Sequence, residues 1–439
     1  MTVVDTTQGA DTPLGRALAA GDLAEMEMAF TDHQGHMCGK RIPAHRIARG
    51  ARVAFCSAAL AWDYIGDVHD GTSITGPDSG YPDAFLLPDH GTYRRLPWRP
   101  EAGHVICDVV DHHGELLPQA PRTVLRRAIE RIAALGYDVR MGFEIEMYLL
   151  GPDGQPASTG VHCYSLQKAN DLDPAASAIL LHLGDFVELE GGNVEYGPGQ
   201  FEINLANGDA LAAADAAIRL KYGVRETARR QGIKATFMAK PFNKLSGSSM
   251  HLHVSLWKDG EPAFAPENGA ENPLMRLALG GLIRHLPGIA VYGSPTVNSY
   301  KRFEVDSFAP VNVSWGGDNR TVSIRSLIES PGATRIELRT PAADANPYWA
   351  AAALLTAIAT GIEDGADPGT RGEGYLYGVG EELPQTLGDA IRAARADERI
   401  VELLGRQAVE DLLLLSSKEW RAFTTQVSAW DIERYQGAI

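Results

Sequence analysis

The sequence predicts an α+β protein made of a small N-terminal domain, residues 18–117, and a larger domain, residues 118–439. Residues 18–117 alternate short apolar runs with turn residues, a pattern typical of a small sheet. Beyond Pro121, stretches with helical periodicity alternate with strand-like runs. A chain of 439 residues is long enough for two such domains. The polar segment 1–17 is expected to be a flexible leader.

Composition and charge exclude several classes of protein. Apolar residues make up 44% and charged residues 22% of the chain, as in ordinary globular proteins. The formal net charge of −16 argues against a general binder of nucleic acid or anionic membranes. The cysteines form no CxxC pair, the N-terminal segment does not resemble a signal peptide, and no apolar run reaches about 20 residues. These features predict a cytoplasmic protein with reduced thiols and without nucleic-acid or membrane partners.

The N-terminal domain is expected to contain strands joined by polar loops. Met26–Phe30 and Ala84–Asp89 are the clearest β-like runs. Between them, the polar segment His69–Ser73 has the composition of a loop that projects from a domain edge. Leu96–Trp98 and Val105–Asp108 close the domain.

The second domain begins with an amphipathic helix. Pro121 stands at its start, Leu125, Ile129 and Ile132 recur at helical spacing, and Gly136 ends it. The further expected elements, in chain order, are a strand over 143–150, a helix over 174–183, strand-like flanks around the turn 196–199, a helix over 210–230, a strand over 234–238, a segment over 247–256 with two histidines on one face, a loop over 259–272, an irregular arginine-rich segment over 294–339, a helix over 350–362 and helices over 387–435.

The strand Phe143–Leu150 is apolar, yet it carries Glu144 and Glu146 two residues apart. Side chains at i and i+2 of a strand lie on one face, so both carboxylates point the same way. In a buried strand they would repel each other and lose hydration, and a divalent cation is the simplest group that would hold both ionised. A half-exposed strand, with Ile145 and Met147 inward and both glutamates in water, is the alternative.

Six side chains form a candidate site for two or three hard divalent cations. They are Glu144, Glu146, Glu195, Glu202, His251 and Glu337. One histidine among carboxylates favours Mg²⁺ or Mn²⁺ over a zinc site. His251 or His253 alone would more often be structural, but the two together follow a Gly-Ser-rich turn and indicate a site.

Arginines cluster between residues 302 and 339, although the chain as a whole is acidic. They are Arg302, Arg320, Arg325, Arg335 and Arg339. Guanidinium groups gather where carboxylates or phosphates must be held. Metals and arginines together predict phosphoryl chemistry, in a chain that contains neither a Walker P-loop nor a kinase glycine loop. On these residues alone, a guanidino-kinase-like phosphotransferase is one alternative.

Ten motifs follow one another along residues 18–435. They are Asp70–Ser73, Leu96–Trp98, Phe143–Glu146, Glu195–Glu202, Lys240–Phe242, Gly247–Leu256, Pro295–Arg302, Asp318–Arg320, Arg335–Arg339 and Asn346–Tyr348. In their order and spacing the chain resembles the glutamine synthetase superfamily, type I. The segments Asp318–Thr321 and Ala343–Asn346 are more similar to the glutamylpolyamine and glutamylethanolamine synthetase-like branch, the γ-glutamyl–amine ligases, than to the ammonia-using enzymes.

The resemblance implies a β-grasp-like N-terminal domain and a large α/β catalytic domain of the glutamine synthetase type. It implies ATP as co-substrate, with two or three Mg²⁺ or Mn²⁺ ions per site. It also implies a homo-oligomer with sites between subunits, usually a dodecamer of two stacked hexameric rings. Asp70 would then reach the site from a neighbouring subunit.

The resemblance gives each matching side chain an expected role. Glu146, Glu195 and Glu202 match the first metal site, and Glu144, His251 and Glu337 match the second, at the transferred phosphate. Glu190, His253, Ser255 and Arg325 match positions that contact ATP. Arg302 matches the arginine at the glutamate α-carboxylate, with Ser246 and Gly247 beside the substrate. Arg320 and Arg339 match the arginines around the γ-phosphoryl group, and Asp70 and Glu195 complete the expected catalytic set.

Two departures from the family pattern concern the substrates. True glutamine synthetases carry a Glu-Ala-Pro-like triplet in the loop after the substrate arginine, and its glutamate helps to bind ammonium and take its proton. Here the triplet is Phe308-Ala309-Pro310, so ammonium loses a partner and a bulkier amine gains packing area. Ser246 stands where the family usually has asparagine beside the glutamate amino group, which puts the acid substrate in question.

The sequence therefore predicts an ATP-dependent γ-glutamyl–amine ligase, a carbon–nitrogen ligase. It would form a γ-glutamylamide from glutamate and a small amine through γ-glutamyl phosphate, releasing ADP and phosphate. One alternative is an ordinary glutamine synthetase, which Phe308 disfavours. Another is a non-catalytic scaffold or regulator, which the retained metal ligands disfavour. Polyamines, ethanolamine, and other alkyl or aryl amines all remain open as acceptors.

Overall fold

The computed structural model describes residues 11–439, and its first element is helix α1 (Pro13–Ala20). The expected flexible leader is wrong for residues 13–17. The Thr12 hydroxyl accepts a hydrogen bond from the Gly15 N–H at 3.1 Å, Pro13 occupies the first turn, and Leu14 is fully buried. These are the features of a capped, packed helix. Residues 1–10, the rest of that predicted leader, lie outside the described residues.

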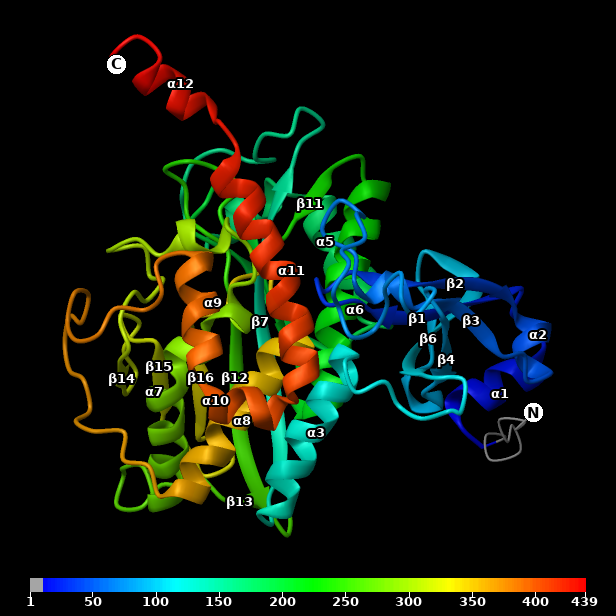
Figure 1. Ribbon diagram of the computed structural model, residues 1–439, viewed down its shortest axis with the longest axis horizontal. Coiled ribbons are helices and arrows are strands. Elements are labelled where there is room, and N and C mark those ends of the chain that lie inside the picture. Colours follow the sequence, from blue (N-terminus) through cyan, green and yellow to red (C-terminus); the bar gives the residue numbers. More distant parts are fainter. Residues whose placement is uncertain (1–10) are drawn as a thin grey trace.

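The first sheet is mixed and has six strands. They are β1 (Glu25–Thr31), β2 (Met37–Pro43), β3 (Val53–Cys56), β4 (Asp83–Pro88), β5 (Arg94–Leu96) and β6 (Arg99–Val110), accompanied by α2 (Ala44–Ala48), η2 (Ser57–Leu60) and η3 (His90–Thr92). The order is β2-β1-β6-β4-β3, with β5 paired to β6, and β1 runs parallel to β6. Figure 1 shows this sheet, in blue and cyan, beside the larger remainder of the chain.

The second sheet has ten strands and carries the larger part of the molecule. They are β7 (Asp138–Leu150), β8 (Leu189–Val194), β9 (Gln200–Leu205), β10 (Gly208–Asp209), β11 (Lys234–Thr236), β12 (Met250–Lys258), β13 (Glu261–Pro262), β14 (Trp315–Gly316), β15 (Ile324–Leu327) and β16 (Arg335–Leu338). The main path is β14-β15-β16-β12-β7-β9-β8, with β7 near its centre. The segment 294–339, expected to be irregular, therefore supplies three strands. Two of them, β15 and β16, have four residues each and show little periodicity.

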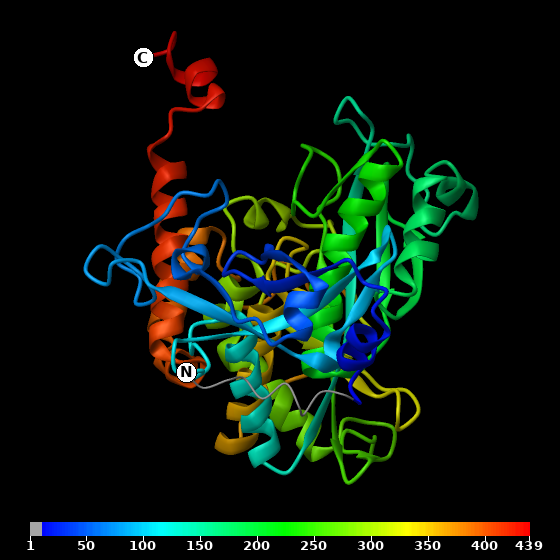
Figure 2. The same ribbon diagram turned by 90° about the vertical axis from the view of Figure 1, so that its right-hand side faces the viewer.

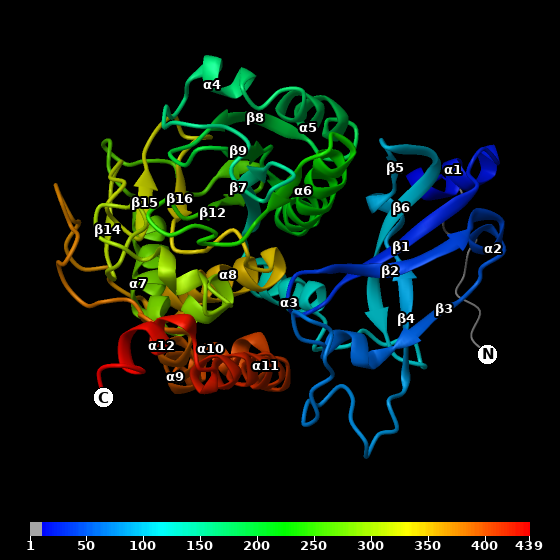
Figure 3. The same cartoon turned by 90° about the horizontal axis from the view of Figure 1, so that it is seen from above.

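The helices that accompany this sheet follow one another between Pro121 and Tyr435. They are α3 (Pro121–Ala134), α4 (Leu166–Asn170), α5 (Ala175–Leu183), α6 (Ala210–Arg230), α7 (Pro273–Gly293), η4 (Ser299–Arg302), α8 (Pro347–Asp364), α9 (Leu387–Ala396), α10 (Glu398–Leu404), α11 (Arg406–Thr425) and α12 (Ala429–Tyr435). Figure 3 shows α9, α10 and α11 as an outer layer beyond α7 and α8. Figures 1 and 2 show α12 projecting from the body at the C-terminus.

Helix α7 is an element that sequence periodicity did not reveal. It contains Gly280, Gly281 and Pro287, which ordinarily weaken a helix. The glycines are required by its packing against α8, because a Cβ on Gly281 would meet the Ala357 carbonyl oxygen at 2.1 Å. By length and apolar composition α7 could cross a membrane, but most of its apolar window is buried inside the protein. We therefore describe α7 as a core helix.

Arg122, at the start of α3, links the two sheets electrostatically. Its guanidinium donates to Asp108 of β6 at 2.6 Å and to both carboxylate oxygens of Asp215 in α6 at 2.9 and 2.8 Å. A further bond reaches Asp89 at 2.8 Å. All but Asp89 are buried, and removal of one member of such a network would leave uncompensated charge. The network fixes the N-terminal domain against the helices that cover the second sheet.

Candidate active site

The register around β7 brings side chains from four strands into one row. Glu144 lies opposite His251 of β12 on one side and Asn204 of β9 on the other, and Glu146 lies opposite Glu202 of β9. On the far side of β12, His253 lies opposite Glu337 of β16. Because alternate residues share a face, these groups gather on one side of the sheet. All of these except the fully buried Glu337 line a cavity of about 670 Å³.

Burial decides between the two interpretations of the central strand. Ile145 and Met147 are fully buried, but so, nearly, is Glu146, at 8% exposure. Its carboxylate accepts hydrogen bonds from the Ser249 N–H at 2.8 Å and the Gln200 side-chain amide at 3.2 Å. The half-exposed strand with both glutamates in water is therefore wrong. Glu144 is more accessible, but it faces the same cavity.

Glu146, Glu195 and Glu202 form a cluster of carboxylates at the cavity. None of the three has an ion-pair partner among residues 11–439. Burial raises the pKa of Glu202, and the charges of Glu146, Glu144 and Glu195 raise it further. Burial and the charge of Glu195 likewise raise the pKa of Glu146, and burial raises that of Glu195. Neutral donors give partial compensation only: the Asn193 amide reaches Glu195 at 3.0 Å. The cluster therefore favours bound protons or a bound cation.

Glu144 is the junction between this cluster and two histidines. Its carboxylate lies 3.1 Å from His253 Nε2 and 3.4 Å from His251 Nδ1, and His251 Nδ1 lies 3.5 Å from Glu337 Oε1. Burial raises the pKa of Glu144, but the two histidine hydrogen bonds outweigh it and the pKa is lowered. Ligand atoms of Glu144, His253 and Glu337 lie within 4.8 Å of one another, a spacing suited to one metal ion. Glu144, His253 and Glu337 could thus hold one metal ion, and His251 lies within 3.5 Å of the same two carboxylates.

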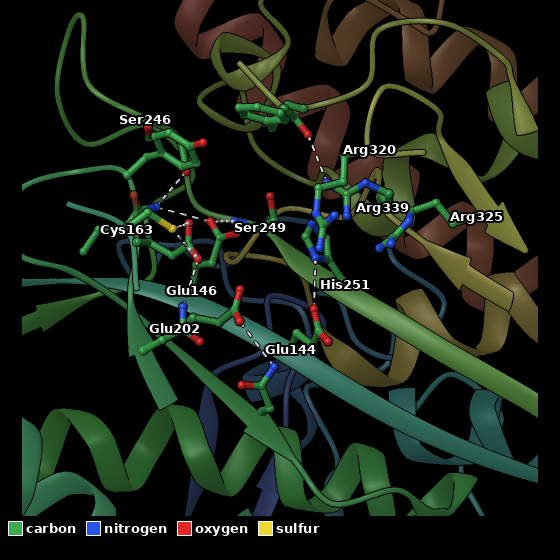
Figure 4. A pocket seen from close by; sticks show the side chains of 18 of the residues that line it. Glu144, Glu146, Cys163, Glu202, Ser246, Ser249, His251, Arg320, Arg325 and Arg339 are labelled. Carbon is green, nitrogen blue, oxygen red and sulfur yellow. Dashed lines mark hydrogen bonds and ion pairs between the residues drawn. The ribbon is translucent and has the colours of Figure 1, made fainter. Parts of the chain in front are cut away.

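Glu337 is fully buried and sits between two arginines. Arg339 donates to one of its oxygens at 2.7 Å, and Arg325 donates to the other. Burial opposes its ionisation, but the charges of Arg339 and the nearby histidines lower its pKa to about 2. Arg325 also pairs with Asp318, and the exposed Arg320 lines the cavity beside them. Figure 4 shows the carboxylates of Glu144, Glu146 and Glu202 on one side and the three arginines on the other, with His251 between.

Arg302 is a buried cation with no carboxylate partner within ion-pair distance among residues 11–439. It is 1% exposed, and it donates to the Ser249 hydroxyl at 2.9 Å and to the Thr340 carbonyl. Its Nε has no hydrogen-bond partner in this part of the chain, and burial lowers its pKa to about 10. Gly247 lies against its stem, since a Cβ there would meet Arg302 Cγ at 2.3 Å. The Arg302 guanidinium lines the cavity and is ready to take an anion.

A second cavity, of about 300 Å³, adjoins the first and contains the other expected nucleotide contacts. Glu190 and Ser255 line it, and Glu144, His253 and Arg335 line both cavities. Arg335 donates to His253 Nδ1 at 3.2 Å and to Glu329 at 2.9 Å. Arg325, by contrast, lies on the first cavity only, with Ser246 and Gly247. An elongated substrate such as a nucleotide could therefore extend from the carboxylate cluster into the second cavity.

Asp70 lines neither cavity of this chain. It lies exposed on a loop of the N-terminal domain, where the Tyr81 hydroxyl donates to it at 3.2 Å. The loop is held against α11, because the Ser73 hydroxyl and N–H donate to Asp411 at 2.6 and 2.7 Å. Asp70 is thus the one expected catalytic residue that the fold of a single described chain does not bring to the site.

The structure adds residues that sequence reasoning did not select. Tyr196 stacks on Phe308, with ring centroids 5.3 Å apart, and both line the main cavity. Cys163 lies 3.8 Å from the Glu195 carboxylate. Gln200 bonds both Glu146 and the Gly247 carbonyl. Tyr196 and Gln200 lie within the motif Glu195–Glu202, which was a usable signal, whereas Cys163 stands in no motif.

Comparison with known proteins identifies the fold and its chemistry. The family model described as glutamine synthetase, catalytic domain, matches residues 118–435. The chain belongs to the glutamine synthetase family. A GmaS/ADP complex superimposes with a TM-score of 0.86 at 31% identity, over 97% of this chain and 99% of that one. The fold is therefore the mixed α and β catalytic fold of glutamine synthetases.

Relatives of the family differ in the amine that their names give. Glutamate–isopropylamine ligase of Pseudomonas sp is 35% identical over 436 residues, 94% of this chain and 95% of that protein. Gamma-glutamylethanolamide synthetase GlnA4 of Streptomyces coelicolor is 32% identical, over 95% and 93% of the two chains. A glutamine synthetase of Halobacterium salinarum is 34% identical over 99% of both. The chain is an ATP-dependent carbon–nitrogen ligase that resembles the γ-glutamyl–amine ligase branch.

The glutamine synthetase family uses divalent metals, and the side chains of this chain fit them. The buried carboxylates of Glu146, Glu195 and Glu202 repel one another unless a cation or protons compensate them. Oxygen donors in this number suit hard cations, and the histidines beside Glu144 add nitrogen donors for a second ion. The donor set does not distinguish Mg²⁺ from Mn²⁺.

Proposed function

We propose that this glutamine synthetase family enzyme is an ATP-dependent γ-glutamyl–amine ligase. A side-chain carboxylate oxygen of glutamate attacks the γ-phosphorus of ATP, which gives γ-glutamyl phosphate and ADP. The nitrogen of a neutral amine then attacks the acyl carbon, the C–O bond to phosphate breaks, and the amine proton passes to a base. The products are a γ-glutamylamide, ADP and phosphate.

Different residues of the two cavities serve the glutamate, the phosphoryl group and the nucleotide in this reaction. Arg302, the buried cation without a carboxylate, takes the α-carboxylate of glutamate, with Ser246 and Gly247 beside it. Arg320 and Arg339 face the transferred phosphoryl group, where charge develops and preorganised cations stabilise it most. Glu190, His253, Ser255 and Arg325 hold ATP, the first three from the second cavity.

The metal ligands would be the two sets of side chains already described. The first set is Glu146, Glu195 and Glu202, and the second is Glu144, His251 and Glu337, with His253 equally close to Glu144. Bound Mg²⁺ or Mn²⁺ would neutralise phosphate charge and polarise the phosphoryl group. With an ion bound, Glu337 would exchange part of its pairing with Arg325 and Arg339, and both arginines would face the phosphate groups.

The observation that carries the amine assignment is the aromatic side chain at position 308. Phe308 lines the main cavity, and its backbone carbonyl accepts a hydrogen bond from Arg339 at 3.2 Å. An aromatic ring there cannot accept a proton from ammonium as a carboxylate would, but it offers apolar area to an alkyl group. The acceptor we propose is therefore an amine larger than ammonia.

The test is a panel of acceptors with glutamate, ATP and Mg²⁺ or Mn²⁺, read by phosphate release and product mass. Ammonia, methylamine, isopropylamine, ethanolamine, 1,4-diaminobutane and spermidine are compared. We expect γ-glutamylamide from an organic amine at a higher kcat/KM than for ammonia. If glutamine forms from ammonia as fast as any other amide forms, the protein is an ordinary glutamine synthetase. If no acceptor gives a product, the protein is a non-catalytic member of the family. A Glu337→Ala preparation measures contaminating ligases.

We also propose that the enzyme is a cytoplasmic homo-oligomer, a dodecamer of two hexameric rings, in which Asp70 completes a neighbour's site. The exposed position of Asp70, away from both cavities of its own chain, supports this, and the mixed order of the first sheet supports a β-grasp-like N-terminal domain. The test mixes two variants, Asp70→Asn and Arg302→Ala, after dissociation, and assays them at a glutamate concentration far below the raised KM of Arg302→Ala, where each variant alone has little activity. Recovered activity in the mixture is expected, because some sites then combine two intact residues. No recovery would place Asp70 and Arg302 in one chain's site.

A further inference from the structure

We propose that the stacked rings of Tyr196 and Phe308 form the acceptor wall of the main cavity, and that this wall selects a primary monoamine with a short alkyl substituent. The inference rests on the proposed function and names the class of amine. The ring centroids lie 5.3 Å apart at an interplanar angle of 29°. Each residue is 45% exposed, so the stack still presents apolar area to a ligand.

The wall is positioned beside the reacting groups from two directions. Tyr196 lies in the turn between β8 and β9, directly after Glu195 of the carboxylate cluster. Phe308 lies in the segment between η4 and β14, and Arg339 holds its carbonyl. An alkylamine whose carbon chain lies on the rings would therefore place its nitrogen near the phosphoryl-facing arginine. This is the geometry that attack on an acyl phosphate requires.

The backbone at Phe308 shows that the ring is held in place against a conformational cost. Its φ is +59°, in the left-handed region that bulky residues rarely adopt. Asp306, two residues earlier, has φ +65°, and its carboxylate accepts a hydrogen bond from Tyr375 at 2.7 Å. Such strain persists where surrounding contacts fix it, and it occurs often at ligand-binding positions. Here the contacts are Arg339, Tyr375 and the Tyr196 ring.

The charges around the main cavity argue for one amino group only. Its lining carboxylates are all engaged: Glu144, Glu146, Glu195 and Glu202 in the donor cluster, Asp318 with Arg325, and Glu329 with Arg335. Asp306, in the loop that carries Phe308, does not line the cavity and accepts a hydrogen bond from Tyr375. In the proposed function a neighbour's Asp70 would serve the reacting nitrogen, so no lining carboxylate described in this chain is left at the aromatic wall to pair with a second ammonium. A diamine would therefore desolvate its far cation against apolar rings, which costs free energy. A monoamine with the same carbon chain avoids that cost.

The decisive comparison needs no variant. With wild-type enzyme, n-butylamine and 1,4-diaminobutane present the same carbon chain with and without the second cation. We expect kcat/KM for n-butylamine to exceed that for 1,4-diaminobutane by about tenfold or more, the scale at which a pocket discriminates such differences. A higher kcat/KM for the diamine would overturn the inference while leaving the proposed ligase standing.

Variants then test the wall itself. We expect Phe308→Leu and Tyr196→Leu each to lower the ratio of kcat/KM for n-butylamine to that for ammonia by about tenfold. The double variant should lower this ratio by less than the product of the two single decreases, because the two rings contact each other. Tyr196→Phe should keep the wild-type ratio, because the ring is retained. Phe85→Leu, the same change on half-buried β4 outside both cavities, is the matched control.

An unchanged ratio in active, folded Phe308→Leu and Tyr196→Leu enzymes would also overturn the inference, since amide would still form without the wall. If wild-type enzyme forms no amide with any organic amine, the proposed function fails first and the acceptor wall with it. The two failures are therefore distinguishable in one set of assays.

Discussion

Replacement of Arg302 by alanine tests how the site takes its acid substrate. The residue is 1% exposed, carries a positive charge and, within residues 11–439, has the Ser249 hydroxyl and the Thr340 carbonyl as its hydrogen-bond partners. Burial of a guanidinium that is paired only with neutral oxygens costs desolvation free energy, and a bound carboxylate would offset that cost. Burial lowers its pKa to about 10, in the direction expected for a cation that lacks its anion.

The magnitude follows from the contact that is lost. A charge-assisted, bidentate bond between guanidinium and carboxylate contributes about 2–3 kcal/mol, which corresponds to about a hundredfold in affinity. We expect Arg302→Ala to raise the KM for glutamate by about that factor, with a much smaller change in the KM for ATP. Arg302→Lys keeps the charge but not the planar fork, so it should fall between wild type and alanine.

The assay is steady-state phosphate release with glutamate varied at saturating ATP, together with the shift in Tm that glutamate produces. Glutamate should stabilise the wild type through binding and leave the Tm of Arg302→Ala unchanged. Ser249→Ala is the matched control, because it removes the hydroxyl partner of Arg302 and keeps the cation. An unchanged glutamate KM in a folded Arg302→Ala enzyme would refute this role. Another acid substrate, as Ser246 allows, would then have to be sought.

Three further predictions concern the phosphoryl and acceptor sides of the site. Glu337→Ala should abolish ligation, because it removes a proposed metal ligand, takes its carboxylate partner from buried Arg339 and leaves Arg325 with Asp318 alone; undiminished turnover would contradict the two-metal site. The raised pKa values of Glu146 and Glu202 mean that the metal-free fold binds protons at these two side chains more tightly than the unfolded chain does. The resulting stabilisation of the fold is present below the unfolded pKa near 4.5 and is lost as pH rises through the folded pKa. The Tm difference between Mg²⁺ and chelator should therefore widen from pH 6 to pH 9, and a constant difference would exclude these ligands. Tyr375→Phe should raise the amine KM by about threefold at unchanged ATP KM, since it frees Asp306 in the loop that carries Phe308; equal rises in both KM values would indicate a general disturbance.

The parts of the fold with strong local signals were predictable. Helix α6 has the predicted bounds, 210–230, because its caps and apolar spacing are local properties of the sequence. The shared face of Glu144 and Glu146 follows from the two-residue period of a strand, and the sheet confirms it. The strand neighbours that complete the site, β12 and β9, required the motifs, because strand pairing between distant segments leaves no local pattern.

The parts that were not predictable depend on tertiary contacts. Helix α7 forms despite Gly281 and Pro287, because α8 packs close enough to exclude a side chain at the glycine. Helix α1 replaces part of the expected leader, because Leu14 buries itself in the core of the N-terminal domain. The contact between Tyr196 and Phe308 joins two loops far apart in the sequence and requires a left-handed backbone at Phe308. None of these follows from composition or periodicity.

The division of labour between sheet and loops explains how one family can serve different amines. The groups proposed to bind metal, such as Glu146, Glu202 and Glu337, lie on paired strands, where a one-residue slip would turn every one of them to the opposite face. Their positions are therefore tied to the core itself. Tyr196 stands on the turn that joins the paired strands β8 and β9, and Phe308 stands on a loop between η4 and β14. We expect substitution at these two positions to change the acceptor while the groups on the strands stay in place; relatives at 35 and 32% identity carry the names of different amines on one fold.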